Sequence, residues 1–142
     1  MARPSRVGNV LVDSGAWIAL LSARDQHHAE ADAAFRRALR ERVRLVTTNL
    51  VLAEVHRLLL FRAGIRAAAL ALDRIAASEH VDLVFAVEAD HHAARSWMTR
   101  LADQRLTYTD AVSFAVMKSR KCDAVLGFDH DFAVAGFRFW PE

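Results

Sequence analysis

Four acidic residues stand where their carboxylates could act together: Asp13, Glu54, Asp110 and Asp129. Asp13 and Asp129 each directly follow a short apolar run, and Glu54 and Asp110 lie near the starts of two helix-like segments. Two unit charges 4 Å apart repel by about 4 kcal/mol at an effective dielectric constant of about 20. A group of four acids must therefore take up protons or bind a cation, and the pattern predicts a divalent-metal site that serves phosphate chemistry.

The expected metal ligands are oxygen atoms. Cys122 is the only cysteine, which excludes an internal disulfide and a cysteine-rich zinc site. Oxygen ligands in a small site fit Mg²⁺ or Mn²⁺, which would activate a water molecule and neutralise charge on the phosphate. Asp110 could equally be a helix cap, whereas Glu54 lies in an apolar helix where an unpaired charge is unfavourable. Asp131 competes with Asp129 for the fourth place.

Short segments rich in Val and Leu alternate with amphipathic segments of helical period. This alternation predicts an α/β fold, a mostly parallel sheet with helices on both faces, and the 142 residues suit a single domain over residues 1–142. Asp25, Thr109 and either Thr48 or Asn49 are the expected N-caps of three of the helices. We expect strands at 7–12, 43–47, 81–85, 123–128 and 137–140, and helices at 16–21, 26–39, 50–62, 66–78, 88–101 and 110–118.

The composition indicates a globular protein and argues against a membrane anchor. Apolar residues make up 54% of the chain, yet no apolar run approaches the ~20 residues needed to span a bilayer. The first apolar run contains an acid and lacks a cleavage site, so we expect no signal peptide and a cytoplasmic protein. A cluster of arginines beside the candidate metal site favours a polyanionic partner, although such residues also commonly solvate a helix face. The cluster comprises Arg36, Arg37, Arg40, Arg42 and Arg44.

The motifs, taken in order, resemble those of PIN-domain proteins, and more closely those of VapC-type toxins of toxin–antitoxin pairs. The resemblance extends over residues 10–139. It rests on VLVDSGAWIAL at 10–20, Asp25 with His28, TN at 48–49 through Glu54, LTYTDAVS at 106–113, and FDHDF at 128–132 with Gly136.

The resemblance implies a five-stranded parallel sheet and an endoribonuclease that depends on Mg²⁺ or Mn²⁺. The four acids named above match the family's four acidic positions as metal ligands and catalytic residues. Supporting polar positions, which orient a carboxylate, a bound water or a phosphate, match Ser14, Asn49 and Ser113, with Asp131 as a further candidate. The same residues could instead be helix caps or turn residues. Many relatives carry a Thr two residues before the last acid, where this chain has Gly127.

The resemblance further implies the toxin of a type II toxin–antitoxin system, which cleaves RNA through a metal-activated water. A small VapB-like antitoxin would bind in a groove formed by the helices at 50–61 and 66–77, and a homodimer is expected. The apolar residues at 58–61, Leu58, Leu59, Leu60 and Phe61, could instead be core or the face of a homodimer. Two alternatives stay open: a housekeeping RNA-processing nuclease that has no antitoxin, and a non-catalytic metal- or RNA-binding module.

Overall fold

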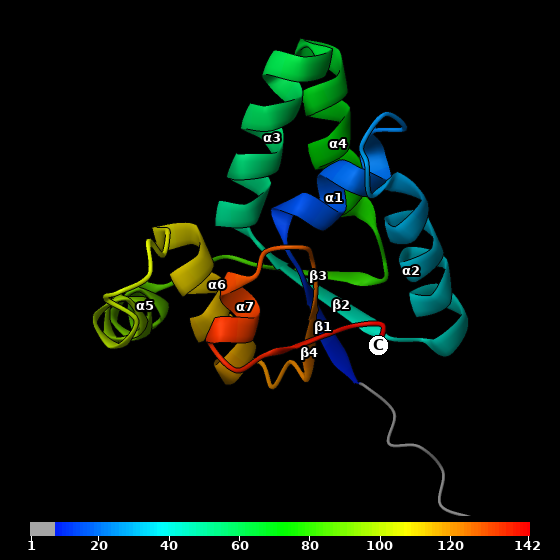
Figure 1. Cartoon of the computed structure of the whole chain (residues 1–142). Helices are drawn as coiled ribbons and strands as arrows, with labels where there is room; N and C mark the ends of the chain where they lie inside the picture. Colours follow the sequence, from blue (N-terminus) through cyan, green and yellow to red (C-terminus); the bar gives the residue numbers. More distant parts are fainter. Residues whose placement is uncertain (1–7) are drawn as a thin grey trace, which may run out of the picture.

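The computed structural model describes residues 8–142, so Val7, expected in the first strand, lies outside the described residues. Within the described residues, five strands form one sheet in the order β3-β2-β1-β4-β5, and every neighbouring pair is parallel. The predicted parallel α/β sheet is thus confirmed (Figure 1). The strands are β1 (Asn9–Val12), β2 (Arg44–Thr48), β3 (Val81–Val84), β4 (Ala124–Leu126) and β5 (Arg138–Phe139).

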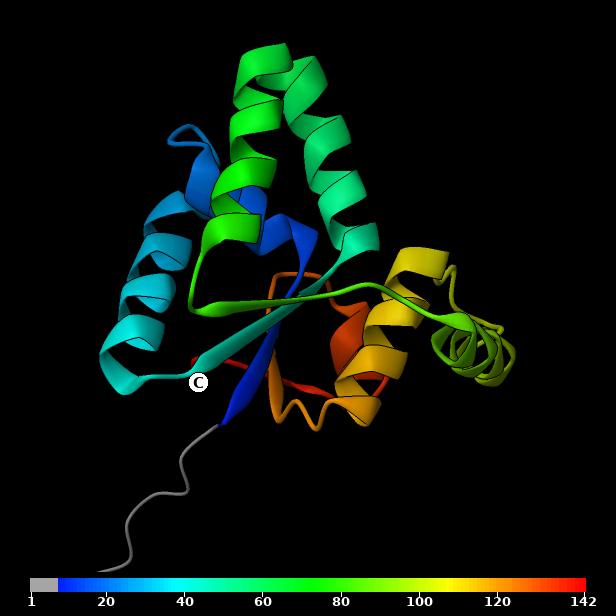
Figure 2. The ribbon, with the colours of Figure 1, turned by 180° about the vertical axis from the view of Figure 1, so that it is seen from behind.

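Helices cover both faces of the sheet, as the sequence predicts. Figures 1 and 2 show α1 to α4 on one side of the strands and α5 to α7 on the other. The helices are α1 (Ser14–Leu21), α2 (His28–Glu41), α3 (Asn49–Ala63), α4 (Ile65–Ala77), α5 (Glu88–Arg100), α6 (Tyr108–Ser119) and α7 (Asp131–Val134).

The central strand β1 is buried on both of its faces, which explains its unbroken apolar sequence. Val10 and Val12 pack into the core formed with α1 to α4, whereas Leu11 between them packs into the core formed with α5 to α7. All three side chains are fully buried. This alternation fixes the register of the strand and carries its C-terminal end directly to Asp13.

Two helix starts differ from the prediction. Thr107, rather than Thr109, is the N-cap of α6, because its Oγ accepts a hydrogen bond of 3.1 Å from the backbone N–H of Asp110. Asp25 does not cap α2, which begins at His28; its carboxylate instead accepts a hydrogen bond from the backbone of His27 in the preceding turn. Of the two caps proposed for α3, Thr48 is the one observed.

The two helices α3 and α4 form a hairpin that projects beyond the carboxyl ends of the strands (Figure 1). They are joined by Gly64, whose φ of +96° lies in the region that favours glycine. Phe61 and Ile65 at the turn are 80% and 77% exposed, so the hairpin presents apolar side chains at its tip. Among the described helices, none is both long enough and apolar enough to cross a membrane.

Candidate metal centre at the carboxyl edge of the sheet

Three aspartates from separate parts of the chain meet at the carboxyl edge of the sheet. Asp13 follows β1, Asp129 follows β4 after two residues, and Asp110 lies in the first turn of α6. One carboxylate oxygen from each lies within 4.8 Å of the others. Adjacent parallel strands bring Asp13 and Asp129 together because β1 pairs directly with β4. This grouping, which we call the aspartate cluster, has the oxygen donors that a divalent cation requires.

Asp13 has a buried carboxylate oxygen that no described residue pairs with. Its side chain is 4% exposed, and its Oδ1 accepts no hydrogen bond from any described residue. Burial raises the pKa of Asp13 from an ordinary 3.8 to about 7, a hydrogen bond from the backbone of Ser14 opposes the rise, and the charges of Glu54 and Asp129 add to it. A buried carboxylate with an unpaired oxygen fits a metal ligand, since a cation would supply the interaction that the protein does not.

Asp110 is in a similar position. It is 6% exposed, and burial together with the charges of Asp13 and Asp129 holds its pKa well above the usual range for a carboxyl. The Oγ of Thr107 opposes this rise, because it hydrogen-bonds to Asp110. The raised pKa values of Asp13 and Asp110 favour the protonated form of these two carboxyls near neutral pH unless a cation neutralises their charge.

Glu54 lies beside the aspartate cluster, outside the group of oxygens that lie within 4.8 Å of one another. It is half-buried on α3, where its Oε1 accepts a hydrogen bond of 2.8 Å from the Oγ of Ser14. Its charge still raises the pKa of Asp13, which places it within electrostatic reach of the cluster. Ser14 therefore joins the start of α1 to α3 and fixes the Glu54 carboxylate next to the aspartates.

The other polar candidates occupy different kinds of position. Asn49 accepts a hydrogen bond of 2.9 Å from the backbone N–H of Ala86, so its amide oxygen joins α3 to the segment after β3. Ser113 is fully buried, and its Oγ has no hydrogen-bond partner among the described residues. Asp131 begins α7, and its backbone N–H donates to Oδ1 of Asp129 over 2.9 Å. Of these two acids, Asp129 is the one in the cluster.

Gly127 lies against Asp13, and this contact gives a steric reason for its small size. A Cβ atom at position 127 would lie 3.1 Å from the Cβ of Asp13, tighter than most contacts of real side chains. A threonine at this position would push against Asp13. The absence of a side chain at Gly127 thus allows the loop after β4 to lie close to Asp13.

Arg40, Arg42 and Arg44, the later members of the arginine cluster, lie toward the opposite edge of the sheet, so for them the expected position beside the acids was wrong. Helix α2 begins near the carboxyl edge and runs back to the start of β2, where Arg44 pairs in register with Asn9 at the start of β1. Arg36 and Arg37 form ion pairs with Asp32 and Glu41 of the same helix. These two arginines therefore form exposed ion pairs on the surface of α2, and such pairs contribute little to stability.

An aromatic contact beside the cluster was not anticipated. Phe128 directly precedes Asp129, and its ring stacks on the imidazole of His27 with centroids 4.1 Å apart and planes inclined by 11°. The signal was available in the sequence, because a large apolar residue stands between a strand end and an acid. Stacked aromatic rings next to phosphate-binding groups are a common platform for nucleic-acid bases.

A hollow lies between α1, α3 and α4. It has a volume of about 440 Å³ and combines apolar side chains such as Leu21, Leu59 and Leu70 with three arginines, Arg24, Arg62 and Arg74. The sequence predicted a groove formed by the α3 and α4 segments, and the structure places one there.

Comparisons with known proteins agree with this geometry. A family model described as the PIN domain matches residues 10–138. The chain is 35% identical over 133 residues to the 23S rRNA-specific endonuclease VapC20 of Mycobacterium tuberculosis, in both strain CDC 1551 / Oshkosh and strain ATCC 25618 / H37Rv. The match covers 90% of this chain and 95% of that protein. The crystal structure of M. tuberculosis VapC20, titled a Sarcin-Ricin loop cleaving toxin, superposes with a TM-score of 0.79 at 32% identity, covering 90% of this chain and 95% of that one.

Proposed function

From the premise that the chain belongs to the PIN-domain family and to its VapC-like members, we propose that it is a metal-dependent endoribonuclease and the toxin of a type II toxin–antitoxin pair. The observation that carries the proposal is the aspartate cluster, in which three carboxylates lie within 4.8 Å of one another and Asp13 has an unpaired buried oxygen. PIN-domain nucleases use divalent metals, and the donor set of the cluster suits Mg²⁺ or Mn²⁺.

The residues that would hold the metal are Asp13, Asp110 and Asp129, with Glu54 completing the set. A bound divalent ion supplies an activated water and neutralises negative charge on the phosphate. Residues of the chain hold these carboxylates in position. The Oγ of Ser14 donates a hydrogen bond of 2.8 Å to Glu54, and Thr107 caps α6 at the turn that carries Asp110.

The substrate that we propose is ribosomal RNA. Two observations support this choice: the similarity to a 23S rRNA-specific endonuclease, and the structural similarity to a toxin described as cleaving the Sarcin-Ricin loop. Both likenesses extend over 90% of this chain. We propose a cytoplasmic location, because a protein that acts on ribosomal RNA must reach ribosomes.

The test is cleavage of purified 23S rRNA by the full chain in Mg²⁺ or Mn²⁺ and in excess chelator. We expect cleavage with either metal, loss of cleavage in chelator, and loss of cleavage in Asp13→Asn and Asp110→Asn. Asp73→Asn, which changes an exposed acid on α4, is the matched control and should cleave normally. Cleavage by the Asp13 or Asp110 variant at the wild-type rate, or undiminished cleavage in chelator, would contradict the proposal.

We propose that the hollow between α1, α3 and α4 receives a segment of the antitoxin. Its apolar walls and its three arginines suit an amphipathic segment that carries acidic residues. Expression of the chain should arrest growth, and the small protein encoded beside it should relieve the arrest. Leu70→Glu, which places a charge in the hollow, should abolish relief while arrest persists; relief that is unaffected would contradict this site.

We further propose that two copies of the chain associate through the tip of the α3–α4 hairpin. Phe61 and Ile65 are the most exposed large apolar residues among those described, and a second copy would remove them from water. Sedimentation of the wild type should give a dimer, and Phe61→Glu together with Ile65→Glu should give a monomer. A wild-type monomer at micromolar concentration would contradict this interface.

A further inference from the structure

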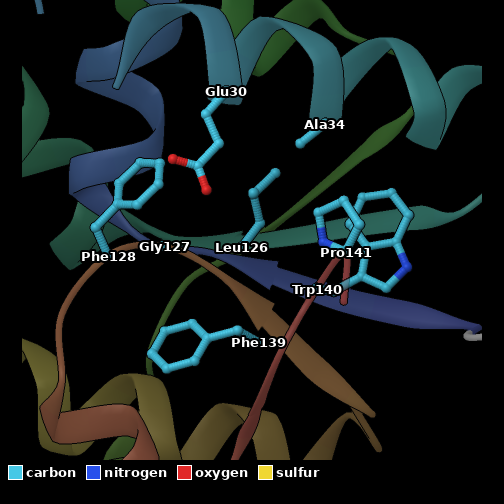
Figure 3. A pocket seen from close by; sticks show the side chains of 8 residues that line it. All are labelled: Glu30, Ala34, Leu126, Gly127, Phe128, Phe139, Trp140 and Pro141. Carbon is cyan, nitrogen blue, oxygen red and sulfur yellow. The ribbon is translucent and has the colours of Figure 1, made fainter. Parts of the chain in front are cut away.

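A pocket beside the aspartate cluster has no role in the site so far. It lies between α2 and the C-terminal ends of β4 and β5, with a volume of about 280 Å³ (Figure 3). Small-molecule pockets usually begin near ~300 Å³, so this pocket suits a single planar ring system. Its lining residues are Glu30, Ala34, Leu126, Gly127, Phe128, Phe139, Trp140 and Pro141.

Aromatic rings form much of the pocket wall and are held in place by their own contacts. Phe128 is stacked on His27, and Trp140 is 6% exposed and packed into the core beneath α2. Phe139 lines a further edge. Fixed aromatic faces favour a flat π-system, and base–aromatic stacking contributes about 1–3 kcal/mol per base.

Glu30 is the one charged residue among those that line the pocket. Figure 3 shows its carboxylate reaching from α2 into the space bordered by Phe128 and Leu126. Its side chain is 71% exposed and its Oε2 lies 3.5 Å from Nδ1 of His27, so the carboxylate stands at the mouth of the pocket, where a ligand can reach it. A carboxylate at the mouth of an aromatic pocket favours a ligand with donors, and it disfavours one that presents only acceptors.

Guanine is the base that best matches this arrangement. Its Watson–Crick edge presents two adjacent donors, the N1–H and the 2-amino group, which a carboxylate can accept side by side. Adenine and cytosine each offer one donor group next to an acceptor, and uracil flanks its single donor with two carbonyl groups. Splayed bases of single-stranded RNA are recognised in this way, by stacking and by hydrogen bonds to that edge.

We infer that the pocket binds an unstacked guanine base of the RNA strand that enters the aspartate cluster. The two sites adjoin each other: Phe128, which lines the pocket, directly precedes Asp129, and a Cβ at Gly127, which also lines it, would lie 3.1 Å from the Cβ of Asp13. A base held here is therefore close to the acids and sets which phosphate reaches them. The inference rests on the proposed function, since it names the base that accompanies the scissile phosphate.

The test uses nucleotides that differ only in the base edge, with the full-length protein in chelator so that no cleavage occurs. Guanosine 5′-monophosphate, inosine 5′-monophosphate and adenosine 5′-monophosphate share the ribose and phosphate, and inosine lacks only the 2-amino group of guanine. Binding is followed by NMR shifts of backbone amides and of the Trp140 indole. We expect guanosine monophosphate to shift Gly127, Phe128 and Trp140 and to bind about fivefold or more tighter than inosine monophosphate.

Glu30→Gln keeps the shape of the side chain but replaces one acceptor oxygen with a donor. The preference for guanosine over inosine monophosphate should then fall to about one, because the variant pairs with only one of the two donors. Asp32→Asn, an equal change of charge on the same helix outside the pocket lining, is the matched control and should keep the preference. Both variants change partly or fully exposed residues, and thermal unfolding checks that they fold.

Equal binding of the three nucleotides, shifts confined to residues outside the pocket, or a preference unchanged in Glu30→Gln would each overturn the inference. Its failure is distinguishable from failure of the proposed function, because this assay needs neither metal nor cleavage. Cleavage of ribosomal RNA without guanosine preference removes the pocket assignment alone. Guanosine preference without cleavage removes the nuclease assignment alone.

Discussion

Replacement of Asp13 by Asn should stabilise the metal-free protein at alkaline pH while abolishing metal-dependent stabilisation. The folded state holds the pKa of Asp13 at about 7, against 3.8 as the ordinary value. The folded protein therefore binds more protons than the unfolded chain between these values, and its stability falls as the pH rises through them. Since one pKa unit is about 1.4 kcal/mol, full ionisation of Asp13 costs about 4 kcal/mol.

Most of this loss lies between pH 5 and pH 8, where we expect Asp13 to account for a decrease of about 2–3 kcal/mol in the free energy of unfolding. Asn has nearly the same shape and stays neutral, so the variant should lack this decrease. Urea denaturation in chelator at both pH values measures it directly. Asp73→Asn, an exposed change of equal charge, should follow the wild type.

Saturating metal should remove the advantage of the variant. A ligand at 1,000 times its dissociation constant stabilises the folded state by about 4.1 kcal/mol, which offsets the cost of ionising Asp13, and only the wild type retains the full set of acids. The reasoning is refuted if Asp13→Asn is less stable than the wild type in chelator at pH 8. It is equally refuted if the wild type shows no loss of stability between pH 5 and pH 8.

Three further changes test the contacts around the cluster and the core. Gly127→Thr should crowd Asp13, because the new Cβ would lie 3.1 Å from the Cβ of Asp13. The variant should bind metal more weakly in calorimetry, and its free energy of unfolding should fall by about 1–3 kcal/mol; tighter metal binding would contradict this. Ser14→Ala removes the hydrogen bond to Glu54, so cleavage and metal affinity should fall several-fold while stability falls by only about 1 kcal/mol; an unchanged cleavage rate in limiting metal speaks against that role. Phe114→Ala removes a fully buried ring that contacts three other aromatic rings. The free energy of unfolding, measured by urea denaturation, should fall by about 3–5 kcal/mol, and a loss under about 1 kcal/mol would contradict this.

The meeting of Asp13 with Asp129 was predictable because both follow short apolar runs, and parallel strands end at one edge. The contact between Glu54 and Ser14 was not, since the rotation of a helix about its axis depends on packing that sequence period alone leaves open. The N-cap of α6 at Thr107 was missed for a similar reason. Two threonines stand two residues apart, and either could cap the helix until the backbone path is known.

The arginine cluster shows an error that topology alone could have prevented. In a strand–helix–strand unit the helix returns the chain to the edge where the next parallel strand begins. Residues that end α2 and begin β2, such as Arg42 and Arg44, must then lie far from an acid that follows β1. A residue close to a strand in sequence lies near the acids only if it is next to the carboxyl end of that strand, and not if it is next to the amino end.

The strand order determines when the aspartate cluster can assemble during synthesis of the chain. The central strand β1 lies between β2 and β4, so Asp13, the first member of the aspartate cluster, meets Asp129, the last, only when residues near position 129 have been made and folded against β1. Chains fold progressively from the N-terminus as they emerge, and sheet pairings between distant segments form late. A nascent chain that has not yet reached Asp129 therefore lacks the complete aspartate cluster. The metal centre, and with it the proposed cleavage of RNA, cannot form before β4 and the loop after it have been made and have paired with β1.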